Sequence, residues 1–210
     1  MTGLSTYWGG RLASALESNP EIEAIIGVDS REPTRELTRT EYVKVGVEHR
    51  LIEKIVRAAR IDTVIDARLM VDSLRGPDGL RPEQIHENNV IGTLNILAAC
   101  AAGDSPVRKL VFKSSAHWYG CAQDDPAYFT EDMSRRYEPE TRVERDVVEA
   151  ESAVEEFRGQ RPKVTVSVLR FANVLGAEVD TSHVQFFALP AVPMIAGFDP
   201  RYQFVDEVDV

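Results

Sequence analysis

The stretch of residues 2–29 is the part of the sequence that most constrains the fold. It opens with the turn Thr-Gly-Leu-Ser-Thr-Tyr-Trp-Gly-Gly, continues into a helical stretch, and ends with an apolar run, residues 22–29. A glycine turn that opens a helix offers unpaired N–H groups and the positive end of the helix dipole to a phosphate. Asp29 stands twenty positions after Gly9, where a dinucleotide-binding fold places the acceptor for a ribose 2′-hydroxyl. This order predicts a dinucleotide site. The alternative is an ordinary strand-to-helix turn in which Asp29 is a solvated strand end.

The rest of the chain alternates between predicted strands and predicted helices. We expect strands at residues 22–29, 42–47, 63–65, 107–112 and 164–169, and helices at residues 9–18, 50–60, 82–102 and 140–157, with loops at 69–79 and 123–138. Strands separated by helices of this length indicate βαβ units. The fold class expected is therefore α/β, a doubly wound parallel sheet of the Rossmann-like NAD(P)-binding type. Ligands of such sheets bind beyond the carboxyl ends of the strands. The residues that fall there are Gly3, Asp29, Asp66, Ser115 and Asn173.

The charge balance excludes two classes of partner. The net charge is −10 and the pI is about 5.0, without a basic cluster, so we expect neither nucleic acid nor a membrane surface as a partner. The two cysteines, Cys100 and Cys121, suit a reducing cytoplasm better than a disulfide framework. The histidines show no ligand spacing, so no metal is expected. The partner expected is a small-molecule substrate, and a homodimer is the assembly considered.

Four segments resemble motifs of the NAD-dependent epimerase/dehydratase family, the extended short-chain dehydrogenase/reductases. Residues 2–9 resemble the family's TGxxGxxG loop, with Thr6 in place of the middle glycine. Residues 89–93, NVIGT, resemble its helix motif, and residues 114–120, SSAHWYG, resemble its SSxxxYG strand end. Residues 169–176, LRFANVLG, resemble its LRxxNVxG segment. The four occur in the family's order and span nearly the whole chain.

The resemblance implies a role for Ser115, whose hydroxyl would bond the oxygen of the substrate's carbonyl or hydroxyl group. In the family a tyrosine transfers the proton, and a lysine four residues later lowers the pKa of that tyrosine. With Glu151 at the family's glutamate position, the tyrosine position is Val143 and the lysine position is Val147. Neither valine exchanges a proton, so the chain is an atypical member that lacks the Tyr-x-x-x-Lys pair.

Two other side chains are candidates for the missing acid/base group. Tyr137 is the nearest tyrosine, although Pro139 places it before the helix, so only the folded geometry can bring it to the site. His117 is the second candidate, because the intrinsic pKa of histidine is near neutrality. The alternative is that His117 is packed or solvated and takes no part in the reaction. Strand alternation points Lys113 away from Ser114.

The cofactor that the resemblance implies is NAD. The residues expected to bind it are Gly3, Ser5, Thr6, Gly9, Asp29, Arg31, Asp66, Asn89 and Ser114. Asp29 accepts from a ribose 2′-hydroxyl and repels a 2′-phosphate, which favours NAD over NADP, while the nearby Arg31 is the feature against this preference. Two positions depart from the family. Gly46 stands where an aspartate near the adenine is frequent, and Arg68 stands where small residues are usual. Arg68 either crowds or binds the pyrophosphate, or pairs with Asp66 as a weak surface pair.

Two functions of different classes remain open from the sequence. The first is an NAD-binding, epimerase/dehydratase-like oxidoreductase with a rearranged acid/base set, acting on an alcohol, a ketone or a sugar-nucleotide type of substrate. The second is a dinucleotide-binding protein without turnover, a pseudoenzyme or a sensor, which the valines at positions 143 and 147 favour. A truncated gene product is a third interpretation.

Residues 1–170 are expected to form the dinucleotide-binding domain, and residues 171–210 the start of a substrate-binding region. We expect the first strand of the sheet to be missing, because Met1 directly precedes the glycine loop. That strand would lie between the strands ending at Asp29 and near Asp66. We also expect the substrate region to be incomplete.

Overall fold

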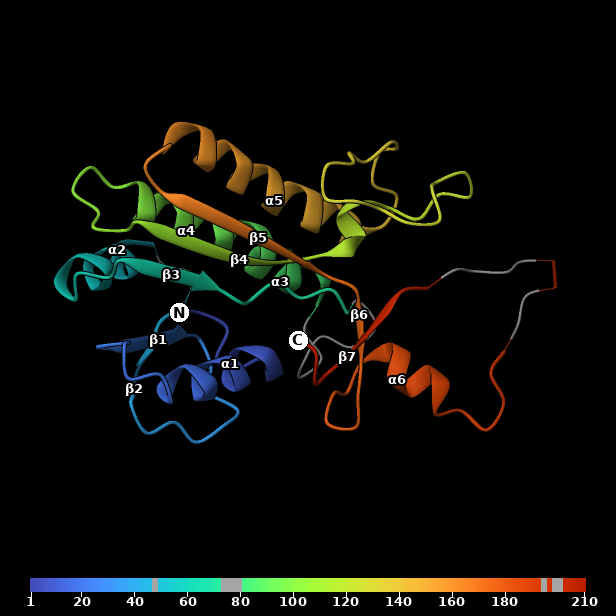
Figure 1. Cartoon of the computed structure of the whole chain (residues 1–210), viewed down its shortest axis with the longest axis horizontal. Helices are drawn as coiled ribbons and strands as arrows, with labels where there is room; N and C mark the ends of the chain where they lie inside the picture. Colours follow the sequence, from blue (N-terminus) through green and yellow to red (C-terminus); the bar gives the residue numbers. More distant parts are fainter. Residues whose placement is uncertain (47–48, 73–80, 194–195, 198–201) are drawn as a thin grey trace.

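The computed structural model describes residues 1–46, 49–72, 81–193, 196–197 and 202–210. Its centre is a parallel sheet in two parts, with helices packed against it (Figure 1). Strand β1 (Ile25–Asp29) pairs with β2 (Thr40–Lys44). Strands β3 (Thr63–Asp66), β4 (Lys109–Ser115) and β5 (Thr165–Phe171) pair in that order. The expectation of a Rossmann-like α/β fold is confirmed.

Residues 1 and 2 lie between the two parts of the sheet. The Val28 amide donates to the Met1 carbonyl at 2.9 Å, and the Thr2 amide donates to the Ile65 carbonyl at 2.9 Å. The spatial order is therefore β2, β1, residues 1–2, β3, β4 and β5. This is the place in which a doubly wound sheet holds its first strand. It puts the glycine loop at the centre of the carboxyl edge.

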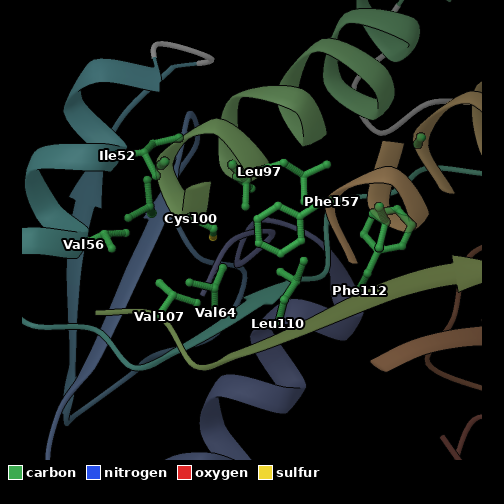
Figure 2. Close-up of a cluster of buried hydrophobic side chains, with 14 of the residues drawn as sticks. Ile52, Val56, Val64, Leu97, Cys100, Val107, Leu110, Phe112 and Phe157 are labelled. Carbon is green, nitrogen blue, oxygen red and sulfur yellow. The ribbon is translucent and has the colours of Figure 1, made fainter. Parts of the chain in front are cut away.

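Three helices share one face of the sheet: α2 (His49–Ala58), α4 (Gly92–Ala101) and α5 (Arg142–Gln160). Figure 2 shows how their apolar side chains meet those of the strands. The labelled contributors are Ile52, Val56, Leu97, Cys100 and Phe157 from the helices, Val64, Leu110 and Phe112 from the strands, and Val107 from the segment before β4. Burying each large apolar side chain is worth about 1.5–3 kcal/mol, so this face is the main source of stability.

Helix α1 (Tyr7–Glu17) packs beside β1, on the side of the sheet away from α4 and α5 (Figure 1). The helix begins two residues earlier than the predicted start at Gly9. The reason is Thr6, which caps the helix by accepting a hydrogen bond from the Gly9 amide. Leu4 and Ala13 are fully buried against this side.

The helix predicted at residues 82–102 is divided into three segments. Helix α3 (Pro82–His86) begins at a proline, as the sequence indicated, and α4 follows a π-helical turn, η2 (Glu87–Ile91). A π-helical turn holds one more residue than an α-helical turn and is frequent at functional sites. The predicted loop at 69–79 lies outside the described residues from position 73 onward.

The segment after β5 forms a small separate layer. Strand β6 (Asn173–Leu175) pairs in parallel with β7 (Phe204–Asp206), and α6 (Ser182–Phe187) lies between them in the chain. A single 3₁₀ turn, η3 (Ala116–Trp118), follows β4. Among the described residues, no helix is both long enough and apolar enough to span a bilayer.

Candidate functional site

The glycine loop is a tightly closed turn. Gly3 has φ +83°, and a Cβ there would lie 2.7 Å from the backbone of Ala67. A Cβ on Gly9 would lie 1.9 Å from the Gly3 carbonyl oxygen, so the helix packs directly on the loop. The Thr6 hydroxyl donates to that carbonyl at 2.7 Å while it accepts from Gly9. Thr6 therefore replaces the family's middle glycine with a side chain that closes the loop and caps α1.

Asp29, at the end of β1, faces this loop. Its Oδ2 accepts from the Ser5 amide and from the Ser5 hydroxyl, each at 3.0 Å, and its Oδ1 accepts from the Arg31 amide at 3.2 Å. An ionised carboxylate has roughly four acceptor positions, so Oδ1 retains capacity for another donor. Asp29 is thus held in place by the loop and still able to bind a hydroxyl group.

A cavity of about 230 Å³, the glycine-loop cavity, lies beside these groups. Five of the predicted cofactor residues line it: Gly3, Ser5, Thr6, Asp29 and Arg31. Seven further residues line it that were not among the predicted cofactor residues: Ser30, Gly46, Arg68, Met70, Gln84, Glu87 and Asn88. The absence of a side chain at Gly46 leaves open space, because a Cβ there would meet no atom within 4 Å.

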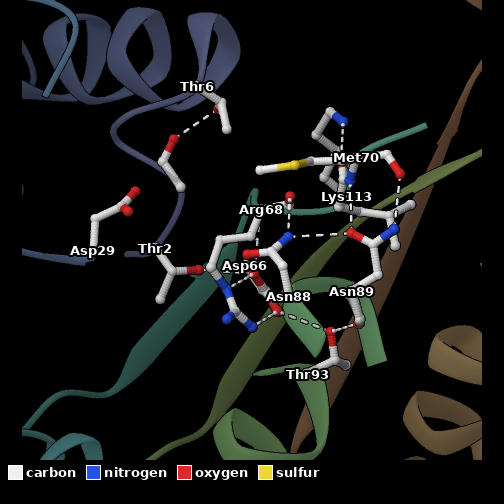
Figure 3. Close-up of polar contacts among 12 residues, drawn as sticks. Thr2, Thr6, Asp29, Asp66, Arg68, Met70, Asn88, Asn89, Thr93 and Lys113 are labelled. Atoms are coloured by element: carbon white, nitrogen blue, oxygen red, sulfur yellow. Dashed lines mark hydrogen bonds and ion pairs between the residues drawn. The ribbon is translucent and has the colours of Figure 1, made fainter. Parts of the chain in front are cut away.

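Asn89 is buried and does not line the cavity, but it holds the segment that does (Figure 3). Its side-chain oxygen accepts from the Met70 amide at 2.9 Å, and its side-chain nitrogen donates to the Met70 carbonyl at 2.8 Å. Asn88, which does line the cavity, donates to the Arg68 carbonyl at 3.0 Å. The two asparagines of the π-helical turn thus fix the segment after β3. Gly9 does not line the cavity either and lies beneath the loop.

Asp66 and Arg68 form a buried ion pair (Figure 3). Arg68 Nε donates to Oδ1 of Asp66 at 3.0 Å and Nη2 donates to Oδ2 at 3.1 Å, while Thr2 and Thr93 also donate to this carboxylate. Burial raises the pKa of Asp66, but the Arg68 charge and the hydrogen bonds outweigh it and hold the pKa below its ordinary value. The alternative in which Arg68 pairs with Asp66 is therefore correct. The expectation that this pair lies at the surface is wrong, because Asp66 is buried and the Arg68 side chain is only 12% exposed.

A second cavity of about 90 Å³, the serine cavity, lies at the ends of β4 and β5. Its lining includes Lys113, Ser114, Ser115 and Asn173. Ser115 Oγ lies 2.7 Å from Nδ1 of His117, so the predicted serine and histidine are in contact. Burial lowers the pKa of His117, and His183 adds to this effect while Glu144 opposes it. The lowered pKa favours the neutral imidazole over the imidazolium.

Charged residues of α5 and β5 hold the end of β4 that carries Ser114 and Ser115. Ser114 Oγ donates to Oε2 of the fully buried Glu151 at 2.5 Å, and Nε of Arg170 donates to Oε1 of Glu151 at 2.7 Å. The Arg170 guanidinium also lies 3.7 Å from the centroid of the Trp118 ring. Ser114, which was predicted to bind the cofactor, thus points toward α5. Strand alternation leaves Lys113 on the opposite face, as predicted, together with Ser115.

Tyr137 lies outside the lining of both cavities. It belongs to the loop before α5, is 46% exposed, and donates its hydroxyl proton to Asp124. This hydrogen bond raises the pKa of Tyr137, which opposes formation of a phenolate. On α5, Val147 is fully buried and Val143 is partly buried within the apolar core.

The residues around the glycine-loop cavity fit a dinucleotide. The cavity has a glycine turn that a Cβ would fill, the N-terminus of α1 beside it, and a carboxylate with acceptor capacity at its far side. Among the described residues, no group of three or more His, Cys, Asp or Glu side chains is arranged to hold a metal ion.

Comparison with known proteins gives one family match. The NAD dependent epimerase/dehydratase family matches residues 1–191. Uncharacterized proteins of Mycobacterium tuberculosis and Mycobacterium bovis are 33% identical to the chain over 213 aligned positions, which cover 100% of this chain and 56% of each relative. The chain thus spans little more than half the length of these relatives.

Several solved structures share the fold of this chain. UDP-glucose 4-epimerase of Thermotoga maritima, solved with UDP-glucose, has a TM-score of 0.69 and 22% identity, over 85% of this chain and 56% of its own. The epimerase Mth375 of Methanothermobacter thermautotrophicus has a TM-score of 0.70 and 20% identity, over 89% and 56%. dTDP-glucose 4,6-dehydratase of Bacillus anthracis, solved with NAD, has a TM-score of 0.64 and 18% identity, over 83% and 54%. At these identities the likeness establishes the fold.

Proposed function

The chain belongs to the NAD dependent epimerase/dehydratase family, and from that premise we propose that it binds NAD(H) and acts as an oxidoreductase on a sugar-nucleotide type of substrate. The oxidised group would be a secondary alcohol and the reduced group a ketone. A bound nicotinamide dinucleotide supplies the acceptor and the donor of hydride. The observation that carries the proposal is the convergence of the glycine turn, the start of α1 and Asp29 on one cavity.

Each part of the dinucleotide has a matching group on the chain. The N-terminus of α1 and the turn at Gly3 would hold the pyrophosphate, because this helix end presents N–H groups and a positive partial charge. Asp29 would accept from the adenosine ribose, and the space at Gly46 suits the adenine. Arg68 would not clamp the pyrophosphate with a free guanidinium, because two of its nitrogens donate to Asp66.

We propose NAD rather than NADP as the cofactor. Asp29 places negative charge where NADP carries its 2′-phosphate, and the two would repel each other. Arg31 lies on the same wall, and one of its side-chain nitrogens is 3.4 Å from the Ser5 hydroxyl. The Ser5 hydroxyl and the Arg31 amide both donate to the Asp29 carboxylate and hold it toward the loop, which supports Asp29 as the acceptor for the ribose.

Substrate binding would fall to the serine cavity. Ser115 would orient the substrate oxygen, with His117 fixing the serine hydroxyl. We propose residues 1–170 as the dinucleotide domain and residues 171–210 as the start of the substrate region, since Asn173 and His183 line this cavity. The activity of the whole protein is part of the proposal, because the relatives are nearly twice as long.

A binding protein without turnover is the second candidate function. It is favoured by Val143 and Val147, which occupy the positions of the family's tyrosine and lysine. A general acid/base contributes about 10²–10⁴-fold to rate, so we expect little or no turnover by the family's standard route. The cofactor site is the same in both candidates.

The remaining parts of the proposal concern the cellular compartment, the partners and the assembly of the protein. Cys100 and Cys121 are both free thiols, which supports a reducing cytoplasm. We propose a small molecule as the partner. We propose neither nucleic acid nor a membrane surface as a partner, because the net charge of the chain is −10. A homodimer is the assembly to examine by light scattering.

The first experiment is a fluorescence titration of the whole chain with NADH, followed by incubation with NAD⁺ and a panel of sugar nucleotides that includes UDP-glucose. We expect saturable NADH binding. Ser115→Ala should lower any turnover, whereas Tyr137→Phe, a change outside both cavities, should leave it unchanged. Absence of NADH binding in the unmodified chain would overturn the proposal. Binding without turnover would select the second candidate.

A further inference from the structure

Lys113 is a titratable side chain that lies on the same strand face as Ser115 and next to it on that face. The two residues are separated by one position on β4, so their side chains leave the same face about 7 Å apart. Both line the serine cavity. Nζ of Lys113 donates to the Leu69 carbonyl at 3.1 Å, which holds the amine beside the segment that follows β3 (Figure 3). A substrate oxygen bound by Ser115 would therefore lie within reach of a lysine amine.

The surroundings of this amine allow it to exchange protons near neutral pH. Burial lowers the pKa of Lys113 to about 8, and the charge of Asp66 opposes that shift. Asp72 and His183 line the same cavity, and His117 contacts its serine. At this pKa both the ammonium and the neutral amine are populated at ordinary pH, as a general acid/base requires.

The other titratable groups near the cavity have different contacts. Asp72 accepts from the Ser182 amide at 2.6 Å, and so holds the start of α6. The His183 ring packs edge-on against Tyr202 and Phe204. Among the described residues, Lys113 donates to one partner, the Leu69 carbonyl, so its ammonium keeps two further N–H groups for a substrate.

We propose that Lys113 is a catalytic residue that transfers the proton of the substrate oxygen, in the role that neither Val143 nor Val147 can perform. This inference rests on the proposed function. In the oxidation direction the O–H bond of a secondary alcohol breaks, and its proton passes to the neutral Lys113 amine, which becomes an ammonium. The C–H bond would break with its electron pair, which the oxidised nicotinamide dinucleotide of the proposed function would take up as hydride, and the C=O bond would form. In the reduction direction Lys113 returns the proton to the oxygen. Ser115 orients that oxygen throughout.

The pKa of the Lys113 amine can be measured without any catalysed reaction. The chain has five lysines, Lys44, Lys54, Lys109, Lys113 and Lys163. With lysine labelled by ¹³C at Cε and ¹⁵N at Nζ, a pH series of NMR spectra should show one side chain with a midpoint near 8. That signal should vanish in Lys113→Met and persist in Lys109→Met, a change at the exposed end of the same strand. A Lys113 midpoint at the ordinary value of about 10.4 would overturn the inference.

The second test separates proton transfer from positioning. Lys113→Arg keeps a positive charge and a donor for the Leu69 carbonyl, but an arginine cannot give up its proton at these pH values. We expect Lys113→Arg and Lys113→Met to lose turnover of UDP-glucose or a related sugar nucleotide with NAD⁺ by about 10²–10⁴-fold. The Kd for NADH should stay within about twofold, since neither variant changes the glycine loop. Lys109→Met should retain full turnover.

The outcomes distinguish the two proposals. Failure of the unmodified chain to bind NADH would overturn the proposed function itself. Full turnover in Lys113→Arg would overturn the catalytic role of Lys113 and leave the cofactor site intact. An unmodified chain that binds NADH but turns over no member of the panel would also overturn that catalytic role.

Discussion

Asp29 is the single side chain on which the choice of cofactor depends. Its carboxylate accepts from the Ser5 amide and hydroxyl and from the Arg31 amide, so it is both buried and oriented before any ligand binds. Asp29→Ala removes the acceptor for the ribose hydroxyl and the charge that repels a 2′-phosphate. We expect NADH affinity to fall by about tenfold, the loss of one charge-assisted hydrogen bond, and the preference over NADPH to disappear.

Fluorescence titration with each cofactor measures that preference. Glu32→Gln is a matched control, because it removes a nearby carboxylate that is exposed and lies outside the cavity lining. A chain that already binds NADPH more tightly than NADH would reverse the assignment, and Arg31 would then be the residue responsible.

The sequence predicted which site residues lie at the strand ends better than it predicted the contacts that each of them makes. Gly3, Ser5, Thr6, Asp29 and Arg31 all line one cavity, because a motif specifies where a turn and a strand end must lie. Asn89 could not be separated from Asn88 in this way. The π-helical turn decides which of the two faces the cavity and which bonds to Met70, and its extra residue leaves no mark in the apolar pattern. Lys113 was placed on the correct face, but its environment depends on Leu69 and Asp66, which are distant in sequence.

The joint between the segment after β3 and α4 depends on the absence of a side chain at Gly92. A Cβ there would lie 2.2 Å from Nη1 of Arg68, whose other nitrogens are bound to the buried Asp66. Gly92→Ala would force the guanidinium to move and weaken a buried ion pair. We expect the free energy of unfolding to fall by about 1–3 kcal/mol, measured by urea denaturation.

Gly103→Ala is the matched control for this change. Gly103 follows α4, and a Cβ there would meet no atom within 4 Å, so its replacement should shift stability by less than about 0.5 kcal/mol. Equal stability of Gly92→Ala and the unmodified chain would show that Arg68 moves freely, which contradicts the rigid pair.

Helices α3 and α5 are joined by a pH-dependent contact. Nδ1 of His86 lies 2.8 Å from Oδ1 of Asp146. That hydrogen bond raises the pKa of His86, the charges of Asp146 and Glu149 add to the effect, and burial opposes it. Because the folded pKa lies above the unfolded value, this contribution to stability is fully present below about pH 6.5 and is lost as the pH rises through the folded pKa.

His86→Gln should therefore destabilise the chain more at about pH 6 than at about pH 9, when urea unfolding is compared at the two values. Glu83→Gln provides the comparison, because Glu83 pairs with Arg142 at 3.6 Å and so joins the same two helices without a histidine. If His86→Gln lowers the free energy of unfolding equally at both pH values, the ring stabilises the contact only by packing.

The order of elements was predictable because hydrophobic periodicity is a local property. The strands and helices of the sheet occur where expected, with shifted ends such as the start of α1 at Tyr7. Those ends are set by individual hydrogen bonds, as when Glu17 accepts from the amide and hydroxyl of Thr40 at the start of β2. The pair β6–β7 joins segments about thirty residues apart in the chain, and neither strand is long enough to show a period.

The two parts of the sheet meet near the carboxyl ends of their strands, where one segment of the chain lines both cavities. Arg68 and Met70 line the glycine-loop cavity, while Val71 and Asp72 line the serine cavity. A dinucleotide that reaches from Asp29 toward Ser115 would thus contact the end of β1, the glycine loop, the segment after β3 and the end of β4. Within the described residues, the backbone contact between β1 and β3 runs through Met1 and Thr2. Such a ligand would add a second connection between the two parts.

NADH should for this reason stabilise both parts of the molecule together. At a concentration 100 times the Kd, the free energy of unfolding should rise by about 2.7 kcal/mol, and the melting temperature should rise with NADH concentration. Hydrogen exchange measured with and without NADH should show added protection at residues 3–9 and 29–31 and also at residues 113–119. Asp29→Ala at the same NADH concentration, now about ten times its Kd, should gain only about 1.4 kcal/mol, with weaker protection on both sides because the ligand spans them. Protection restricted to the glycine loop would mean that the dinucleotide does not extend to Ser115, and the serine cavity would then have to bind its ligand independently.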